Sequence, residues 1–513
     1  MASAERAGSV TVVFSVALFN LRDGRGWSQE DLATRLNDLA DERGLHIRVT
    51  VNTISRWERG LIERPHPLHR QLLAELFGVS LAELGLTRAK ASPIPHAEAP
   101  TPSPTTTSSA LGPPPLRSDR AVVDEHVALQ EHRWRAIRQG LNEHRIELSD
   151  IAARLHRTAA RVENTTLIGR PDWLSAAPIE LAEVRLAWAE TAGSPPVTGT
   201  ERQARGVLPP APDGRPYRRY SHALRDLERP ILFENRVCFR LLDVSWAPSG
   251  GRLTFGQASY FDMVDTSEAV AHELAAGHLV FAPTGTKLAR PSWKRLPLRK
   301  LVGDPFDLGR RVVVPSIDTL TIRRSGASAG FVLHQRDPGQ VAVCGGMFHV
   351  MPAGVFQPSS VSPKACSHDF DLWRNLQREF SEEFLGNLEH DGTASLPIDY
   401  QAGEPFRALN RARWEGKLRV YCFGVGLDPL TLWGEILTVA VIDDDVFDEV
   451  FRDLVQVNAE GTVVTAGGPH RRVHGIPFTE ERVEQLLGSQ PMAPAAAACL
   501  ALAWRHRAVV LDG

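Results

Sequence analysis

A segment rich in proline, serine and threonine divides this chain near its amino end. Between Lys90 and Arg120 the sequence reads ASPIPHAEAPTPSPTTTSSALGPPPLRSD, in which few residues could contribute to an apolar core. Proline restricts the backbone and small polar residues favour solvated, extended chain, so a segment of this kind does not pack into a layer. We therefore predict a linker over residues 88–120, with separately folded units before and after it.

The chain is long, and outside this segment its composition is that of a globular protein. Its 513 residues exceed the roughly 250 to 300 that one hydrophobic core usually supports. Hydrophobic residues make up 43% of the chain and charged residues 23%, which is close to the average for soluble globular proteins. These values predict a multidomain protein.

The spacing of apolar residues predicts a different fold for each part. Residues 1–87 contain short amphipathic stretches that predict an all-α bundle. Residues 121–195, with apolar side chains such as Trp134 and Ile137 at helical spacing, predict a second helical region. Residues 215–513 carry short β-branched and aromatic runs, such as LRVYCFGV and EILTVAVI, with helical patterns between them. That mixture predicts an α/β or α+β domain.

The cysteines and the apolar runs bear on the compartment of the protein. The five cysteines form no CxxC pair and stand far apart, which argues against a zinc knuckle or a disulfide framework and favours a reducing compartment. No apolar run reaches the roughly 20 residues that a helix needs to span a bilayer. We therefore expect a cytoplasmic, nucleoid-associated protein with no membrane segment.

The distribution of charge limits where nucleic acid could bind. The formal net charge of -3 argues against attraction of DNA to the whole surface, so a DNA site would have to be a local basic patch. Between Arg43 and Arg70 six arginines stand against two glutamates. This stretch provides the local positive charge that a phosphate backbone requires.

The same stretch contains the second of two helix starts. Ser28, with two acids among the three residues after it, is typical of a helix N-cap. Thr50 precedes another helix, which Gly60 can end. Ile54 and Trp57 are expected to pack inward. The side chains expected on the outer face near the amino end are Val51, Asn52, Ser55 and Arg56.

Three segments of this region resemble a known family. LRDGRGWSQEDLATRL, TVNTISRWERG and LLAELFGVSLAELG resemble the Cro/repressor-type (XRE) helix-turn-helix of bacterial transcriptional regulators, of the actinobacterial type. The resemblance implies that Gln29 binds a phosphate of double-stranded DNA and that Thr50 and Arg59 lie near the backbone. The four outer side chains would then face bases, where arginine suits guanine and asparagine suits adenine. Arg22 and Glu58 match positions that form a structural ion pair.

Two alternatives remain open for this unit. Residues 37–50 separate the two helices where the family has a tight turn, which predicts either an extended helix or a short wing. The three short helices could also form a bundle that binds a protein partner instead of DNA. If the unit binds DNA, paired half-sites predict a homodimer.

A second candidate site lies on a predicted helix over residues 369–386, DFDLWRNLQREFSEEFLG. Its apolar residues recur at helical spacing and should face the core: Phe370, Trp373, Leu376, Phe380 and Phe384. The acids Glu379, Glu382 and Glu383 lie on a neighbouring face. Spacings of three and four bring their carboxylates together, and a hard cation such as Mg²⁺ would neutralise such a cluster.

The run from Arg378 to Glu383 resembles the conserved helix of Nudix hydrolases, and the preceding GFVLHQR and GGMFHVMPAG resemble the strands that lead into it. The resemblance implies that the three glutamates are catalytic residues that hold Mg²⁺ against a diphosphate, where metal-bound water attacks phosphorus. The glycine and glutamate that the family places upstream fall at Lys364 and Phe370 if the family's spacing is kept. An insertion between Gly354 and Asp369 would explain this departure.

A further carboxylate could come from Glu415 or Glu435. Three interpretations of the predicted helix over residues 369–386 remain open. It is a solvated acidic face, a Nudix-like domain that senses a phosphorylated or nucleotide-like small molecule without turnover, or an active Mg²⁺-dependent pyrophosphohydrolase. The first two need no cofactor. Taken together, the sequence predicts a DNA-binding transcriptional regulator with a Nudix-like sensor domain, and a hydrolase carrying a DNA-binding module is the alternative.

Overall fold

The computed structural model describes most of the chain in two parts. The described ranges are residues 14–43, 49–58, 65, 67–81, 83–84, 86, 119–156, 158–230, 233–247, 250–282, 285–336, 347–387, 397–452, 454, 461–464 and 475–512. The chain separates into two compact units, Met1–Pro115 and Leu116–Gly513. The boundary falls inside the predicted linker, which lies outside the described residues except for its last two.

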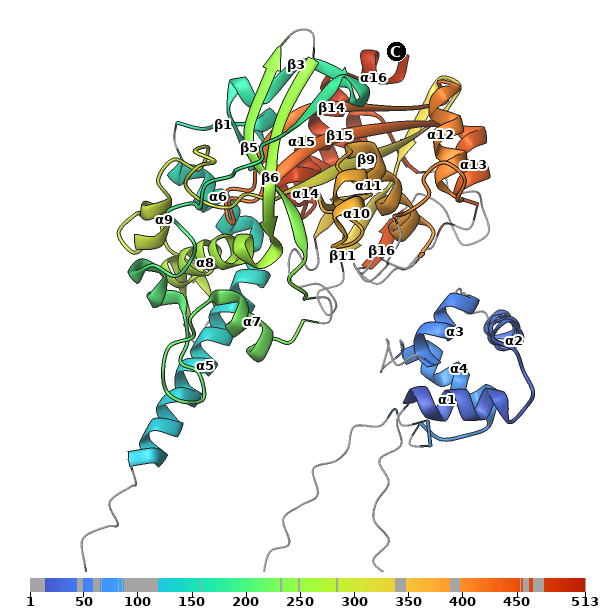
Figure 1. The fold of residues 1–513 in the computed structure, drawn as a ribbon, viewed down its shortest axis with the longest axis horizontal. Helices are drawn as coiled ribbons and strands as arrows, with labels where there is room; N and C mark the ends of the chain where they lie inside the picture. Colours follow the sequence, from blue (N-terminus) through green and yellow to red (C-terminus); the bar gives the residue numbers. More distant parts are fainter. Residues whose placement is uncertain are drawn as a thin grey trace, which may run out of the picture. The chain divides into compact units, whose positions relative to one another are not determined.

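The small unit is a bundle of short helices, as predicted (Figure 1). Its helices are α1 (Phe14–Asp23), α2 (Gln29–Glu42), α3 (Val51–Glu58) and α4 (Pro67–Phe77). One apolar cluster draws on all four helices, and both Ile54 and Trp57 of α3 are buried in it. The inward orientation predicted for these two residues is therefore confirmed.

Local hydrogen bonds set the starts of α2 and α3. The backbone N–H of Asp31 donates to Ser28 Oγ over 3.0 Å, and the Ser28 N–H donates to the Asp31 carboxylate over 2.8 Å. This reciprocal capping satisfies two backbone donors that would otherwise lack partners. Helix α2 then continues to Glu42 and so includes residues 37–42 of the interval 37–50. Residues 44–48, where a wing would lie, are outside the described residues.

The structural ion pair predicted between Arg22 and Glu58 is confirmed. Arg22 Nε lies 2.5 Å from Glu58 Oε1, and the side chains are only 11% and 5% exposed. Glu58 is the last residue of α3, and Arg22 lies in the last turn of α1. The pair therefore joins two helices that are far apart in sequence.

The large unit contains many helices and strands. Its helices are α5 (Asp119–Glu143), α6 (Arg145–Leu155), α7 (Tyr220–Leu227), α8 (Tyr260–His278), α9 (Pro297–Val302), α10 (Pro363–His368), α11 (Leu372–Glu379), α12 (Phe406–Trp414), α13 (Asp444–Val450), α14 (Glu480–Ser489), α15 (Pro494–Arg505) and α16 (Arg507–Asp512). Its strands are β1 (Ala160–Arg161), β2 (Ile168–Gly169), β3 (Leu174–Glu180), β4 (Val184–Trp188), β5 (Val237–Ala247), β6 (Gly250–Ser259), β7 (Leu279–Val280), β8 (Lys287–Leu288), β9 (Pro315–Ser325), β10 (Ser328–Phe331), β11 (Leu333–Arg336), β12 (Phe348–Val350), β13 (Ala353–Val355), β14 (Leu418–Leu427), β15 (Gly434–Asp443), β16 (Gly461–Val464) and β17 (Ile476–Pro477).

A curled mixed sheet forms the centre of the large unit (Figure 1). Within the described residues its strand order is β1-β2-β14-β15-β9-β10-β17, with β13 added to β9 and β3 added to β14. Strands β9 and β15 pair in parallel, with Leu437 opposite Asp318, and the neighbouring pairs are antiparallel. Smaller sheets, β12-β11-β16 and β4-β6-β5, complete the unit.

Strand β15 shows why this sheet is covered by helices on both faces. Ile436 and Ala440 pack into one apolar cluster together with residues of α11, α12 and α13. Leu437 and Val439 pack into another cluster with residues of α15. Because side chains alternate between the faces of a strand, an almost continuous apolar run indicates a strand buried on both sides. The coarse α/β or α+β prediction for this region is thus confirmed.

The prediction of a helical region over residues 121–195 is correct only for its first half. Helices α5 and α6 end at Leu155, and β1 to β4 follow between Ala160 and Trp188. Strand β3 pairs with β14 and β4 pairs in parallel with β6, so these short strands depend on partners far along the chain. The helical spacing that supported the prediction belongs to α5 and α6 alone.

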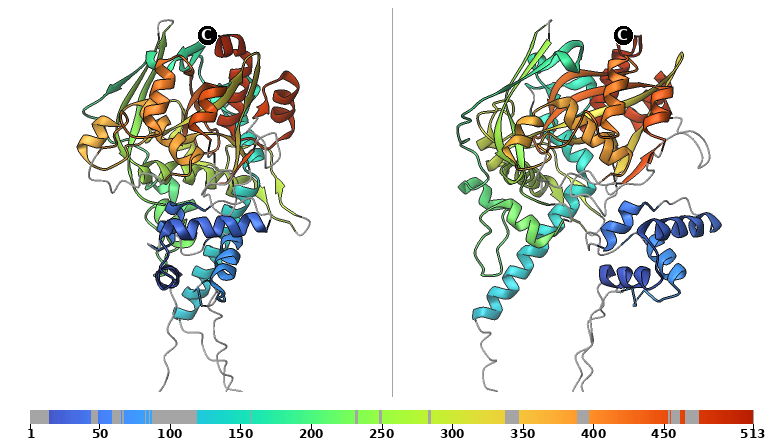
Figure 2. Two further views of the ribbon diagram at one scale, coloured as in Figure 1. Left: turned by 90° about the vertical axis from the view of Figure 1, so that its right-hand side faces the viewer. Right: turned by 45° about the vertical axis from the view of Figure 1, so that its right-hand side comes forward.

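The helices of the amino-terminal half of this unit surround α8. Figure 1 and Figure 2 show α5 crossing α8 and projecting beyond it. Arg138 of α5 forms an ion pair with Glu268 of α8, and both side chains are buried.

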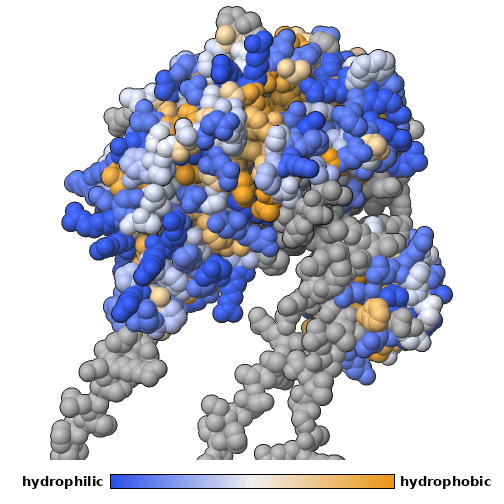
Figure 3. Space-filling model, viewed as in Figure 1, coloured by the Kyte–Doolittle hydropathy of each residue, from blue (hydrophilic) through white to orange (hydrophobic). Residues whose placement is uncertain are grey.

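In the space-filling view an apolar band crosses the face around β3 and β6, amid a largely hydrophilic surface (Figure 3). No helix in the described part of the chain is long and apolar enough to cross a membrane.

We expect Glu58→Gln to destabilise the small unit by about 3 kcal/mol, because it leaves the buried Arg22 guanidinium without a carboxylate. Hydrogen exchange of α1 and α3 amides in the full chain measures this loss. The matched control is Glu75→Gln, since the Arg43–Glu75 pair is 59% and 41% exposed and should contribute less than about 1 kcal/mol. Equal effects of the two substitutions would contradict the structural role of Glu58.

Candidate functional site

Hydrogen bonds hold helix α3 of the small unit at both ends. Ahead of its amino end, the Asn37 side chain donates to the Val49 carbonyl over 2.9 Å and accepts from the Val49 N–H over 2.7 Å. At its carboxyl end, Glu58 accepts hydrogen bonds from Arg22 and from Gln29 Nε2, the latter over 2.8 Å. Polar contacts to α1 and α2 therefore fix both the position and the direction of α3.

The predicted DNA-binding residues fall on α3 and next to it. Thr50 is exposed, and its Oγ1 accepts the Thr53 N–H over 3.2 Å as an N-cap does. The backbones of Val51, Asn52, Ser55 and Arg56 belong to the helix, whereas their side chains are outside what the structure describes, as is all of Arg59. The predicted base contacts therefore stay predictions.

Gln29 has a structural partner that sequence reasoning did not anticipate. Its half-buried side chain donates to Glu58, which also receives the Arg22 guanidinium. The prediction of a phosphate contact by Gln29 is untested, but its amide is already held by Glu58. Gln29 therefore joins the first turn of α2 to the last residue of α3.

In the large unit, the three predicted glutamates lie where α11 widens. Helix α11 ends at Glu379, and residues Phe380–Phe384 form one π-helical turn. A π-turn places one extra residue in the turn and so alters which side chains share a face. Phe380 and Phe384 remain buried with their rings 5.2 Å apart, which confirms the apolar face predicted for this helix.

Two of the glutamates contact strand β13. The Glu379 carboxylate fills the space beside Gly354, where an added Cβ would lie 2.1 Å from Glu379 Cδ. Glu383 is buried, and its Oε1 accepts the Ala353 N–H over 2.9 Å. The absence of a side chain at Gly354 is what lets the Glu379 carboxylate reach the strand. Helix α10 lies between Gly354 and Asp369, and the insertion predicted there stays a prediction.

Three candidate carboxylates remain: Glu382, Glu415 and Glu435. Glu382 is half-buried in the same π-turn. Glu435 lies on β15 next to Ile436, which packs with α11, so the alternation of the strand directs Glu435 to the opposite face. Glu415 follows α12 and lies 3.9 Å from Lys417 Nζ. Neither Glu415 nor Glu435 joins the glutamates of the π-turn.

The geometry also bears on the predicted Mg²⁺ site. Across the described residues, no three histidine, cysteine, aspartate or glutamate side chains are grouped so that they could hold a metal ion. Glu379 lies beside Gly354 and Glu383 beside Ala353, which are successive residues of β13. Glu383 already accepts a hydrogen bond from the backbone N–H of Ala353. In this conformation the three glutamates do not form a ready metal centre.

A buried network positions the segment that precedes α11. The Arg378 side chain donates to Tyr400 Oη over 2.8 Å and lies 3.8 Å from the Asp369 carboxylate. Asp369 accepts hydrogen bonds from the Ser359 N–H over 2.7 Å and from Tyr400 Oη over 3.0 Å. Burial opposes ionisation of Asp369, but Arg378 and these hydrogen bonds hold the pKa of its carboxyl below the usual value. The network ties the chain after β13 to the helix that carries Glu379.

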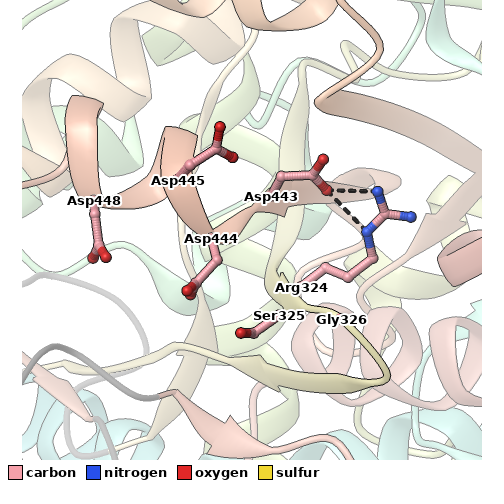
Figure 4. A pocket seen from close by; sticks show the side chains of 7 residues that line it. All are labelled: Arg324, Ser325, Gly326, Asp443, Asp444, Asp445 and Asp448. Carbon is pink, nitrogen blue, oxygen red and sulfur yellow. Dashed lines mark hydrogen bonds and ion pairs between the residues drawn. The ribbon is translucent and has the colours of Figure 1, made fainter.

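One charged pocket was missed by sequence reasoning. It is lined by residues at the ends of β9 and β15 and by the start of α13: Arg324, Ser325, Gly326, Asp443, Asp444, Asp445 and Asp448. Figure 4 shows Arg324 reaching Asp443, while Asp444 and Asp448 point together to another side. Arg323 pairs with Asp444 and with Asp448, the latter over 2.9 Å. The run Asp443–Asp445 is the sequence feature that could have predicted this pocket. Arg323 and Arg324 neutralise much of the negative charge of the run.

We expect Asp369→Asn to lower the free energy of unfolding of the large unit by about 3 kcal/mol at pH 7, because it leaves the buried Arg378 charge uncompensated. Urea unfolding of the full chain measures this. Since the folded-state pKa of Asp369 is lowered, its contribution is complete above the unfolded pKa near about 4 and is lost as the pH falls further. The difference between the two proteins should therefore shrink below about pH 4.

The control for this experiment is Asp371→Asn. Asp371 caps α11 by accepting the Arg374 N–H over 3.0 Å, and asparagine caps a helix about as well as aspartate. This change should cost only a few tenths of a kcal/mol. A loss for Asp369→Asn no larger than that of the control would show that the buried pair does not hold this segment.

Comparison with known proteins gives one similarity, in the small unit. Residues 18–87 are similar to the family described as the SP15 N-terminal domain. The matched residues include part of α1 and all of α2, α3 and α4. We found no match to the chain among curated proteins. The similarity therefore concerns the helical bundle that contains α3.

Proposed function

We propose that this protein is a sequence-specific DNA-binding transcriptional regulator of the XRE type, and that its carboxyl-terminal Nudix-like domain senses a phosphorylated metabolite. The observation that carries the proposal is the fixed position of α3. Asn37 holds the residue ahead of it, and Glu58 at its far end is held by Arg22 and Gln29. A recognition helix needs such support, because its side chains must meet base edges in a defined orientation.

In this proposal α3 enters the major groove of double-stranded DNA. Arg56 and Asn52 read bases, and Thr50 and Arg59 lie near phosphates. The formal charge of the stretch from Arg43 to Arg70, with six arginines and two glutamates, favours this orientation. Binding to paired half-sites by a homodimer would raise the affinity of so small a unit.

We assign the sensing role to the large unit because the run from Arg378 to Glu383 resembles the Nudix helix. Glu383 already accepts a backbone hydrogen bond, and the glutamates are not gathered as a metal site in the described conformation. If a divalent cation binds here, Glu379 and Glu382 are the residues that would hold it. Such a cation would supply charge for binding a diphosphate.

For the DNA-binding role, we expect Arg56→Ala to weaken binding to the cognate site by about 1 to 3 kcal/mol and to relax the preference at one base pair. The reason is loss of a bidentate contact to guanine. Titration of the purified chain against a selected duplex and its single-base variants measures both effects. Unchanged affinity and unchanged preference would contradict the role assigned to Arg56 and would favour a protein partner for the bundle.

For the sensing role, we expect no glutamate-dependent hydrolysis when the full chain is incubated with Mg²⁺ and a panel of nucleoside diphosphate derivatives. The unmodified chain, Glu382→Gln and Glu383→Gln should form phosphomonoester products at the same background rate, because metal-dependent hydrolysis of a diphosphate bond requires several carboxylates around the ion. Turnover that disappears in both glutamine variants would establish the hydrolase alternative instead.

A further inference from the structure

A second pocket of the large unit is cationic. It has a volume of about 660 Å³ and is lined by Ala153, Arg154, His156, Ala159, Arg161, Arg290 and Pro291. We refer to it as the cationic pocket. Its residues come from two parts of the chain, residues 153–161 at the end of α6 and in β1, and Arg290 and Pro291 in the segment after β8. It shares no residue with the glutamate-bearing turn or with the acidic pocket of Figure 4.

The arginines of this pocket are incompletely neutralised. Arg154 and Arg161 share one carboxylate, that of Asp150, at 2.7 Å and 3.0 Å. Arg290 is exposed and lies across the pocket on a different segment. Within the described part of the chain the ion pairs of these three guanidinium groups involve one carboxylate, that of Asp150, which leaves a local excess of positive charge. Guanidinium groups bind phosphate oxygens with paired, charge-assisted hydrogen bonds.

His156, which also lines the pocket, is a neutral imidazole. Its Nε2 lies 3.3 Å from Nη1 of the fully buried Arg299, and because arginine only donates, this nitrogen accepts. The ring proton of the neutral imidazole is then on Nδ1. Burial, together with Arg299 and Arg311, lowers the pKa of His156 to about 3, so the ring stays uncharged near neutral pH. Arg299 and Arg311 also add buried positive charge behind the pocket.

We propose that the cationic pocket binds the phosphate or diphosphate group of a small molecule, through Arg154, Arg161 and Arg290. Three guanidinium groups, two on residues 154–161 and one at Arg290, suit a group with several oxygens rather than a single carboxylate. This site is distinct from the glutamates discussed above and does not require a metal ion. It rests on the proposed sensing role, for which it names the site that binds the phosphorylated ligand, and binding at this site is measured independently of DNA binding.

The test is isothermal titration of the full chain with pyrophosphate and with ADP, both in EDTA so that no metal-dependent site contributes. We expect binding that Arg290→Gln and Arg161→Gln each weaken by roughly tenfold or more. Arg170→Gln is the matched control, because Arg170 is an arginine of the same unit that pairs with Asp172 outside the pocket. It should leave the affinity unchanged.

The comparison of ligands and variants separates the outcomes. Equal affinity for pyrophosphate and ADP assigns recognition to the phosphates alone, and tighter binding of ADP adds contacts to the nucleoside; either supports the proposal. Binding that appears only when Mg²⁺ replaces the EDTA, and that Glu382→Gln weakens while Arg290→Gln does not, would overturn it and place the anion at the glutamates. No binding of either ligand at millimolar concentration would overturn it as well. Folding of each variant is checked by its urea unfolding curve.

Discussion

Strands β9 and β15 pair in parallel at the centre of the large unit, and helices cover both faces of the pair. Parallel neighbours end at the same edge of a sheet. Arg323 and Arg324 of β9 therefore meet Asp444, the first residue of α13, and Asp443, the last residue of β15, and these charges largely cancel. Strand β13 runs antiparallel to β9 and brings Gly354 beneath α11. The central pairing thus determines both the acidic pocket and the surface against which Glu379 rests.

Buried ion pairs join elements that are distant in sequence throughout the protein. Arg22 with Glu58, Arg138 with Glu268, and Arg378 with Asp369 each connect two different elements or segments. Bringing two charges out of water is costly, so such pairs contribute little net stability compared with apolar residues of similar volume. Their effect is on arrangement, since a displaced partner would leave a buried charge uncompensated. In both units they lie next to the element that carries the candidate site.

The sequence was most informative where the structure is local. Ser28 and Thr50 predicted the starts of α2 and α3, and the apolar run EILTVAVI predicted β15, because capping and hydrophobic spacing depend on neighbouring residues. It was misleading for residues 156–195, where β3 and β4 exist only through pairing with β14 and β6. The clustering of the three glutamates assumed a regular helix, and the π-turn at Phe380–Phe384 changes that geometry. The cationic pocket could not be predicted, because Arg290 reaches Arg154 and Arg161 only through long-range folding.

The position of the cationic pocket bears on how a ligand could influence DNA binding. Arg154 lies in the last turn of α6, and α6 follows α5 after a single residue. Helix α5 is the first described element after the linker that leads to the small unit. A ligand that contacts Arg154 therefore acts on the helical pair nearest in sequence to the linker. By linkage, however, it changes the affinity for DNA only if it binds the free and DNA-bound forms with different affinities. A regulatory role thus requires that α5 and α6 differ between those two forms, and tight binding of the ligand alone would not be enough.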